Sequence, residues 1–353
     1  MASTYLTLVN DVLRDMNEVE LTSSNFTASR GVQTTVKDYV NRAISDILNS
    51  ELNWPFTRSE GAVDVIAGKG IYSYASVDST LKYIDYDNVF LQPKNFITNG
   101  TFEISGAASI TGWTAVGGTP AASSKFGNTL LLTNAEASQA VTDLIVGRSY
   151  TVIIQTSGAT LTAEIGTSCG SQTSSSTLTI ASGNEILLSQ LSFTATAITH
   201  YVSFTEAAGE AAFVKFVELS EDVPSIPLQY LSFEDYTERF RERDTRPNTD
   251  RFADPEYVYT TYNNELGLTP IPKDSNRTVK FDYYVSNTDL SAATDTSIIP
   301  TRFESVINSR AKYYTHMFRS DVQTAQFSLK EYEDGLKRMR IELLNRKDYM
   351  RAV

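Results

Sequence analysis

The spacing of apolar residues in the first fifty positions predicts two amphipathic helices. Residues three and four apart are apolar from Tyr5 to Met16, and Ser3 or Thr4 can cap this first helix. A second apolar set repeats the pattern: Val36, Val40, Ala43, Ile44, Ile47 and Leu48. Pro55 cannot continue a helix, so the second helix ends before it. We expect each helix to bury one face.

A period of two replaces the helical spacing after residue 61. Residues 62–66 and 71–74 alternate on either side of the Gly68-Lys69-Gly70 turn, which predicts a β-hairpin, and residues 82–91 predict a further strand. After Pro224 and Pro227 the chain resumes with a short helix over 232–243 and strands over 257–262, 266–268 and 279–285. These segments form a β region.

The composition between residues 95 and 222 differs from that of the flanking sequence. This segment is rich in Ser, Thr, Ala and Gly and poor in Lys and Arg. Seven β-prone runs alternate with turns: 128–133, 149–156, 161–165, 177–180, 186–194, 199–204 and 212–219. Strands at such even spacing are typical of a β-sandwich or jelly roll. We therefore interpret residues 95–222 as an inserted all-β domain.

Two long helices are predicted for the last fifty residues, after Pro300. One apolar stripe contains Phe303, Ile307, Ala311, Tyr314 and Phe318, and another contains Leu329, Tyr332, Leu336, Met339 and Leu343. The predicted fold class is α+β: a helical bundle from the N- and C-terminal helices, an antiparallel β region and the inserted sandwich. Residues 1–94 and 223–353 make up one domain, which the insert at 95–222 interrupts.

Charge and cysteine content exclude several classes of protein. The chain of 353 residues has a net charge of -12, which disfavours a nucleic-acid grip built on clustered Lys and Arg. Neither a signal peptide nor an apolar run long enough to span a bilayer is visible, so we expect a soluble protein with no membrane contact. Cys169 is the lone cysteine, which excludes an intramolecular disulfide and suits assembly in a reducing cytoplasm.

The sequence offers few parts for catalysis. His200 and His316 are the two histidines, and no nucleophile or orienting group accompanies either one. Phosphate-binding, dinucleotide-binding and nucleophile-elbow motifs are absent from the sequence. Asp85 and Asp87 share a strand face and are a candidate cation site, but a solvated strand face is the simpler interpretation. We expect a non-enzymatic protein with no catalytic residues, metal or cofactor.

Two charged segments are candidate interaction sites. Charges of both signs crowd residues 238–246, where we predict an intersubunit ion-pair zone at Arg239, Arg241, Glu242 and Arg243. A nucleic-acid patch would be more uniformly basic. The last nine residues, NRKDYMRAV, form a basic end with one aromatic residue, which suits an exposed arm.

The order of these parts resembles the tail tubular protein A-like head-to-tail adaptors of short-tailed bacteriophages. The resemblance rests on TLVNDVLRDMNEVE, on VNRAISDILNSELNWPF, and on an array of aromatic strands and prolines at 255–259, 266–272 and 279–284. It covers about residues 1–91 and 227–353.

This resemblance implies a virion protein of the tail or neck. Its expected assembly is a homo-oligomeric ring, a dodecamer, between the portal protein and a tail nozzle similar to tail tubular protein B. DNA would pass through the channel during ejection without sequence-specific binding, and tail fibres are a further candidate partner. By the same resemblance, portal docking is assigned to the basic end: Arg346, Lys347, Tyr349 and Arg351.

The insert carries a separate resemblance, to jelly-roll carbohydrate-binding modules. It rests on the opening Asn99-Gly100-Thr101-Phe102-Glu103, on Gly112-Trp113-Thr114, and on the closing run from Phe213 to Glu218. Aromatic faces stack on sugars in such modules, so Trp113 is the glycan-binding candidate. The competing interpretation is a tryptophan that packs at the edge of the sandwich core.

Two other functions fit the same sequence. One is a carbohydrate-binding or carbohydrate-active protein centred on the sandwich, which would need a cleft with two carboxylates at a catalytic separation. The other is a neck or connector ring protein from a different tail type, with similar elements and different partners.

Overall fold

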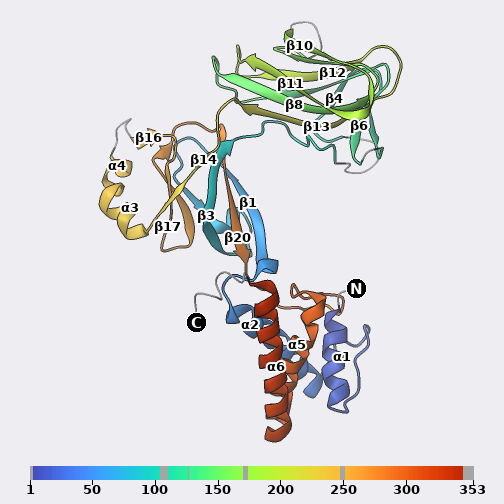
Figure 1. Cartoon of the computed structure of the whole chain (residues 1–353), viewed down its shortest axis with the longest axis vertical. Coiled ribbons are helices and arrows are strands. Elements are labelled where there is room, and N and C mark those ends of the chain that lie inside the picture. The colour runs from blue at the N-terminus through green and yellow to red at the C-terminus, as the bar shows by residue number, and fades with distance from the viewer. Residues whose placement is uncertain (1–2, 104–109, 126, 170–173, 247–250, 345–353) are drawn as a thin grey trace. The chain divides into compact units, whose positions relative to one another are not determined.

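The computed structural model describes residues 3–103, 110–125, 127–169, 174–246 and 251–344. The chain divides into two compact units. The first contains residues 1–61, 74–85 and 281–353, and the second contains residues 62–73 and 86–280. The class is α+β, as predicted, because helices and many antiparallel strands occur together (Figure 1).

Four long helices build the first unit: α1 (Tyr5–Asp15), α2 (Val32–Ser50), α5 (Glu304–Phe318) and α6 (Val322–Leu343). Short 3₁₀ turns lie at Pro55–Thr57, Tyr74–Ser76 and Thr301–Phe303. Thr4 caps α1, since its side chain accepts a hydrogen bond from the Thr7 amide at 3.3 Å. Both predicted N-terminal helices are therefore confirmed.

One hydrophobic core joins the four helices. Fully buried side chains come from α1 (Leu8, Val12), from α2 (Val40, Ile44) and from α5 (Ile307), and Met339 of α6 is buried with them. The α5 stripe was predicted correctly at Phe303, Ile307 and Ala311 but wrongly at Phe318, which is 56% exposed. Phe318 is the last residue of α5, and the chain turns there toward α6, beyond the reach of the core.

Three strands contribute residues to both units: β1 (Arg58–Asp64), β3 (Leu81–Pro93) and β20 (Arg277–Val285). With β14 (Ile226–Pro227) they form a sheet in the order β1-β20-β3-β14. A second sheet has the order β15-β17-β18-β2, from β15 (Gln229–Leu231), β17 (Tyr257–Thr260), β18 (Glu265–Thr269) and β2 (Ile71–Ser73). A ribbon pairs β16 (Phe252–Ala253) with β19 (Ile271–Pro272).

The predicted hairpin around Gly68 is wrong, because its two strands lie in different sheets. β2 pairs with β18, where Tyr72 lies opposite Leu266. The turn itself bonds elsewhere: the Gly68 amide donates to Pro272 O at 2.8 Å, and the Val65 amide donates to Arg277 O at 2.9 Å. The strands on either side of the turn therefore pair with distant segments of the chain and not with each other.

Two pairings of the β region are parallel, whereas the prediction was antiparallel. β15 runs parallel to β17, and β16 runs parallel to β19. Each of these pairings involves a strand of two or three residues, too short for alternation to reveal its direction. Two short helices, α3 (Phe233–Arg239) and α4 (Arg241–Thr245), lie between β15 and β16. They occupy the region where one helix was predicted over 232–243.

The sandwich contains two five-stranded antiparallel sheets (Figure 1). One has the order β10-β9-β12-β7-β4, from β10 (Ser174–Ile180), β9 (Leu161–Gly166), β12 (His200–Glu206), β7 (Ala135–Val141) and β4 (Thr114–Gly117). The other has the order β11-β8-β13-β6-β5, from β11 (Gly183–Thr194), β8 (Ser149–Gly158), β13 (Ala212–Glu221), β6 (Thr129–Leu132) and β5 (Ala121–Ser123). All seven predicted strands are present, and β4, β5 and β7 were missed. The insert boundaries at residues 95 and 222 stay a prediction.

An ion-pair network lies where β8 begins and β13 ends. Arg148 Nη1 lies 3.0 Å from Glu221 Oε1, and Arg148 Nη2 pairs with Asp274. Asn276 also donates to Glu221, whose side chain is only 6% exposed. Burial lowers the pKa of Arg148, and the bonds and charges of Asp274 and Glu221 raise it by more. The guanidinium therefore stays charged and ties the sandwich strands to the segment before β20.

Candidate functional site

The predicted ion-pair zone lies on α3 and α4. Ser232 caps α3, where its hydroxyl accepts from the Asp235 amide at 3.1 Å. Arg239 pairs with Asp235 at 3.6 Å within the helix, and Arg241 and Glu242 are exposed. Glu242 also pairs with Arg246 one turn further on. The side chains of Arg239, Arg241 and Glu242 are therefore accessible to another molecule.

Arg243 differs from the other three residues of this zone, because its side chain is used inside the chain. Its guanidinium lies 3.1 Å from Asp244 Oδ1 and donates to Thr269 Oγ1 at 2.8 Å. The Thr269 hydroxyl in turn donates to Asp244 Oδ2 at 2.7 Å, and Asp244 is 6% exposed. Arg243 thus fastens α4 to the end of β18.

Aromatic rings pack α3 onto β17. Tyr236 stacks on Tyr259 with ring centroids 3.8 Å apart, and Phe233 meets Tyr262 at 4.5 Å. Tyr259 is 2% exposed, and its burial raises its pKa above the ordinary value. Gly267 leaves room for this ring, since an added Cβ would lie 2.2 Å from it. The outermost ring, Tyr262, is 79% exposed.

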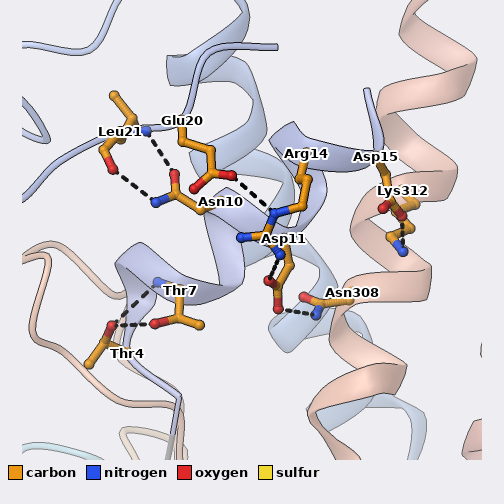
Figure 2. A network of polar contacts seen from close by, with 10 residues as sticks. All are labelled: Thr4, Thr7, Asn10, Asp11, Arg14, Asp15, Glu20, Leu21, Asn308 and Lys312. Atoms are coloured by element: carbon orange, nitrogen blue, oxygen red, sulfur yellow. Dashed lines mark hydrogen bonds and ion pairs between the residues drawn. The ribbon is translucent and has the colours of Figure 1, made fainter. Parts of the chain in front are cut away.

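Polar side chains of α1 hold the loop that follows it (Figure 2). The Asn10 amide donates to Leu21 O at 2.9 Å, and its oxygen accepts from the Leu21 amide at 2.8 Å. Arg14 lies 3.0 Å from Glu20 and 3.2 Å from Asp11. Because Asn10 satisfies both backbone groups of Leu21, the loop is fixed at that residue.

A neighbouring face of α1 contacts α5 (Figure 2). Asn308 donates to Asp11 at 3.3 Å, and Lys312 pairs with Asp15. These polar contacts lie beside the shared hydrophobic core. They connect the first helix of the chain to one that begins about 290 residues later.

An arginine between three tyrosine rings links α2, α5 and α6. Arg310 Nε donates to Asp46 Oδ2 at 2.7 Å, and the Tyr314 hydroxyl donates to the same carboxylate. The guanidinium carbon lies 5.0, 4.7 and 4.8 Å from the ring centroids of Tyr313, Tyr314 and Tyr332. Burial lowers the pKa of Arg310, and Asp46 raises it by more. The arginine is therefore a charged crosslink of the helices.

Large apolar side chains are exposed around the turn between α5 and α6. Met317 is 44% exposed, Phe318 56%, Val322 51% and Phe327 71%. Exposed apolar surface around one turn is typical of sites that another molecule covers. The predicted portal-docking residues, Arg346, Lys347, Tyr349 and Arg351, lie outside the described residues.

Trp113 packs against the sandwich core. Its ring centroid lies 5.4 Å from that of Phe102 and 5.5 Å from that of Phe204, both of which are fully buried. Its indole N–H donates to Asn99 O at 3.4 Å. These contacts are the ones expected of a core tryptophan, and a glycan contact by Trp113 stays a prediction.

The two histidines lie in different surroundings, and His316 has a carboxylate beside it that was not predicted. His200 is fully buried in β12 beside Phe193, and burial lowers its pKa. His316 Nδ1 lies 3.4 Å from Asp321 at the end of α5. Over the described ranges, no group of three or more His, Cys, Asp or Glu side chains is arranged to hold a metal ion. Asp85 of the candidate cation site lies 3.4 Å from Arg58.

A pocket of about 340 Å³ on the sandwich was not predicted. Its lining comes from four separate parts of the chain: Thr101, Glu103, Gly127, Asn128, Gln155, Lys215 and Phe216. No sequence motif joins residues so far apart, and only the strand pairing brings them together.

A family model described as SU10 adaptor protein matches residues 177–353, half of the chain. The chain belongs to the SU10 adaptor family. The family is one of phage head-to-tail adaptors, so this SU10 adaptor is a structural component of the bacteriophage virion. A comparison with curated proteins finds no match.

Solved structures that match part of the adaptor include a phage tailspike, a xylan-binding domain and a sugar-binding protein. Tailspike protein 4 of bacteriophage CBA120 is 16% identical with a TM-score of 0.31, and the match covers 36% of the adaptor and 21% of the tailspike chain. The CBM22-1 xylan-binding domain of Paenibacillus barcinonensis Xyn10C is 10% identical, with a TM-score of 0.30 and coverage of 37% and 96%. A sugar-binding protein of Bacteroides thetaiotaomicron, titled as putative, is 12% identical, with a TM-score of 0.28 and coverage of 36% and 100%.

No helix among the described residues has both the length and the apolar character needed to cross a bilayer.

Proposed function

We propose that this SU10 adaptor forms a closed ring of twelve copies between the portal and the tail nozzle, with a central channel for DNA. The family match carries the proposal, because it extends from β10 through the last helix and so includes most of the β region and both C-terminal helices. The role is structural and non-enzymatic, and it needs no cofactor. Assembly takes place in the host cytoplasm, and the mature location is the virion neck.

A ring of identical subunits needs two different surfaces that meet head to tail and close at one rotation. The exposed charges of Arg239, Arg241 and Glu242 are suited to one of these surfaces, since side chains of both signs can pair across a polar interface. The net charge of -12 suits a channel that must not hold DNA, because like charges repel phosphate.

The helices of the first unit are proposed to form a bundle that engages the portal together with the basic end at Arg346, Lys347, Tyr349 and Arg351. The exposed apolar residues at the turn between α5 and α6 support a docking role for these helices, because a virion partner would cover them. The β region would then face the nozzle. The sandwich, as an insert, is proposed to decorate the outside of the ring and to contact glycans or other virion proteins, tail fibres among them.

Electron microscopy of purified virions, with cross-linking mass spectrometry, tests the ring and its location. We expect a ring density at the portal–tail junction and cross-links from the portal to Leu329 and later residues. If the chain is missing from the particles, the adaptor proposal fails.

Charge reversal tests the interface on α3 and α4. Arg241→Glu is expected to reduce the recovery of tailed particles, and adding Glu242→Arg is expected to restore part of it. Glu185→Lys reverses an exposed charge on the sandwich strand β11 and is the matched control, which should assemble normally. Normal assembly of both α4 variants would place the interface elsewhere.

A further inference from the structure

The sandwich pocket has a composition that suits a specific ligand. Its aromatic wall is the half-buried ring of Phe216, and its polar groups come from Glu103, Asn128, Gln155 and Lys215. Its volume of about 340 Å³ lies at the lower end of the range of about 300–1,000 Å³ typical of small-molecule sites. The pocket therefore has room for one ring-sized unit.

A β-bulge creates one wall of this pocket. Val214 lies opposite Thr156 of β8, but Phe216 lies opposite Gln155, so Lys215 is an extra residue in β13. Val214 and Val217 both belong to the sandwich core, and the two residues between them line the pocket together. In a regular strand these neighbours would point to opposite faces.

The loop before the sandwich strands forms another wall and is held against β13. The Val217 amide donates to Gly100 O at 2.9 Å, and an added Cβ on Gly100 would lie 2.0 Å from Val217 O. Phe102 is fully buried with a positive φ of 56°, which leaves Thr101 and Glu103 on either side of it to line the pocket.

Hydrogen bonds from the Asn99 side chain to the Glu103 backbone also hold this wall. Its side chain accepts from the Glu103 amide at 2.7 Å and donates to Glu103 O at 3.0 Å. These two bonds hold the backbone at Glu103, and a wall held by the chain's own bonds reduces the entropy lost when a ligand is ordered.

The charges and hydrogen-bonding groups select the ligand class. Glu103 and Lys215 supply one charge of each sign, so the lining has no net preference for a charged ligand. Asn128 and Gln155 each offer donors and acceptors, which match hydroxyl groups that also do both. The ring face of Phe216 suits the apolar C–H face of a sugar ring.

We propose that this pocket binds one neutral hexose or pentose unit of a polysaccharide. The proposal deepens the glycan contact suggested above for the sandwich and rests on it. It moves that contact from Trp113, which packs against the core, to Phe216 and Gln155, which lie opposite each other on β13 and β8.

Isothermal titration calorimetry on the full chain tests the site. The probes are tetrasaccharides of β-1,4-glucose, β-1,4-xylose, β-1,4-galactose and β-1,4-mannose, with tetragalacturonate as the anionic comparison. We expect at least one neutral probe to bind, Phe216→Ala to weaken that binding at least tenfold, and Gln155→Ala to weaken it about threefold. Phe327→Ala makes the same chemical change on α6, at a residue 71% exposed, and should leave the affinity unchanged.

Each other outcome overturns a defined part of the proposal. Binding that Phe216→Ala and Gln155→Ala leave unchanged would reject the pocket and keep a glycan contact elsewhere on the chain. Tighter binding of tetragalacturonate would reject the neutral class. No binding of any probe would reject both the pocket and the glycan contact, while the ring proposal depends on the virion measurements alone. Circular dichroism of both pocket variants separates loss of a contact from loss of the fold.

Discussion

Replacing Glu206 by glutamine should weaken the sandwich through lost backbone bonds. Glu206 ends β12 and is 1% exposed, and its carboxylate accepts from four backbone amides. Oε1 accepts from Ala208 at 2.8 Å and from Glu210 at 3.3 Å. Oε2 accepts from Asn134 at 2.6 Å and from Gly209 at 3.2 Å. One side chain thus holds the turn before β13 and the turn before β7.

The expected loss follows from the bonds that an amide cannot make. Glutamine keeps one acceptor oxygen and presents an NH₂ group to the other two donors, so two bonds to a charged group are lost. Each is worth about 1.5–3 kcal/mol. Ala208 and Gly209 are exposed, so water replaces part of the lost bonding, and we expect a total of about 2 kcal/mol.

The pH dependence separates this explanation from a simple packing defect. Burial raises the pKa of Glu206, and the four amides lower it by more, so the folded pKa lies below the ordinary value of 4.5. A depressed pKa gives stability that is fully present above pH 4.5 and is lost as the pH falls through the folded pKa. The difference between the wild type and Glu206→Gln should therefore shrink below pH 4.5.

Hydrogen–deuterium exchange with mass spectrometry can measure this difference in the peptides that cover β12 and β13. Glu210→Gln makes the same exchange on the same turn at an exposed side chain and should change little. A difference of equal size at pH 7 and pH 3.5 would refute the carboxylate explanation, as would unchanged protection of the Glu206→Gln variant at pH 7.

Three further substitutions test contacts described above. Arg310→Met should destabilise the helical unit by about 3 kcal/mol in a urea titration, because it leaves the partly buried Asp46 carboxylate unpaired and removes three ring contacts. The control is Arg302→Met, at an arginine 61% exposed, which should cost under about 1 kcal/mol in the same titration. Arg148→Met should lower stability by about 2 kcal/mol and speed amide exchange over residues 273–276, and unchanged exchange there would contradict the proposed tie. Gly267→Ala should cost about 1–3 kcal/mol by crowding the Tyr259 ring, and an unchanged melting temperature would show that the ring can move.

Local patterns predicted the elements whose identity depends on nearby residues. The apolar spacing of α1 and its cap at Thr4 are properties of one short segment, and both are confirmed. The strands of the sandwich were predictable where β-branched residues alternate. β7 has the sequence AEASQAV, with small residues in place of β-branched ones, and its pairing with β12 and β4 makes it a strand.

Features that depend on pairing between distant segments could not be predicted from the sequence. The turn at Gly68 looked like a hairpin, since alternation does not reveal which partner a strand takes. The pocket depends on one extra residue at Lys215, which appears only when β13 is aligned with β8. Trp113 could be named as important from its residue type, but its neighbours Phe102 and Phe204 were needed to show that it packs inward.

The shared core of the first and last helices sets the order in which the chain can fold during synthesis. About 250 residues separate the end of α2 from the start of α5. At about 5–20 residues per second, the ribosome needs roughly 12 to 50 seconds to make them. During that time α5 and α6 are not available to cover the apolar faces of α1 and α2. The sandwich strands, in contrast, have all been synthesised before α5 begins. A chain released before α5 and α6 are made would therefore carry an apolar stripe that these helices cover in the complete fold.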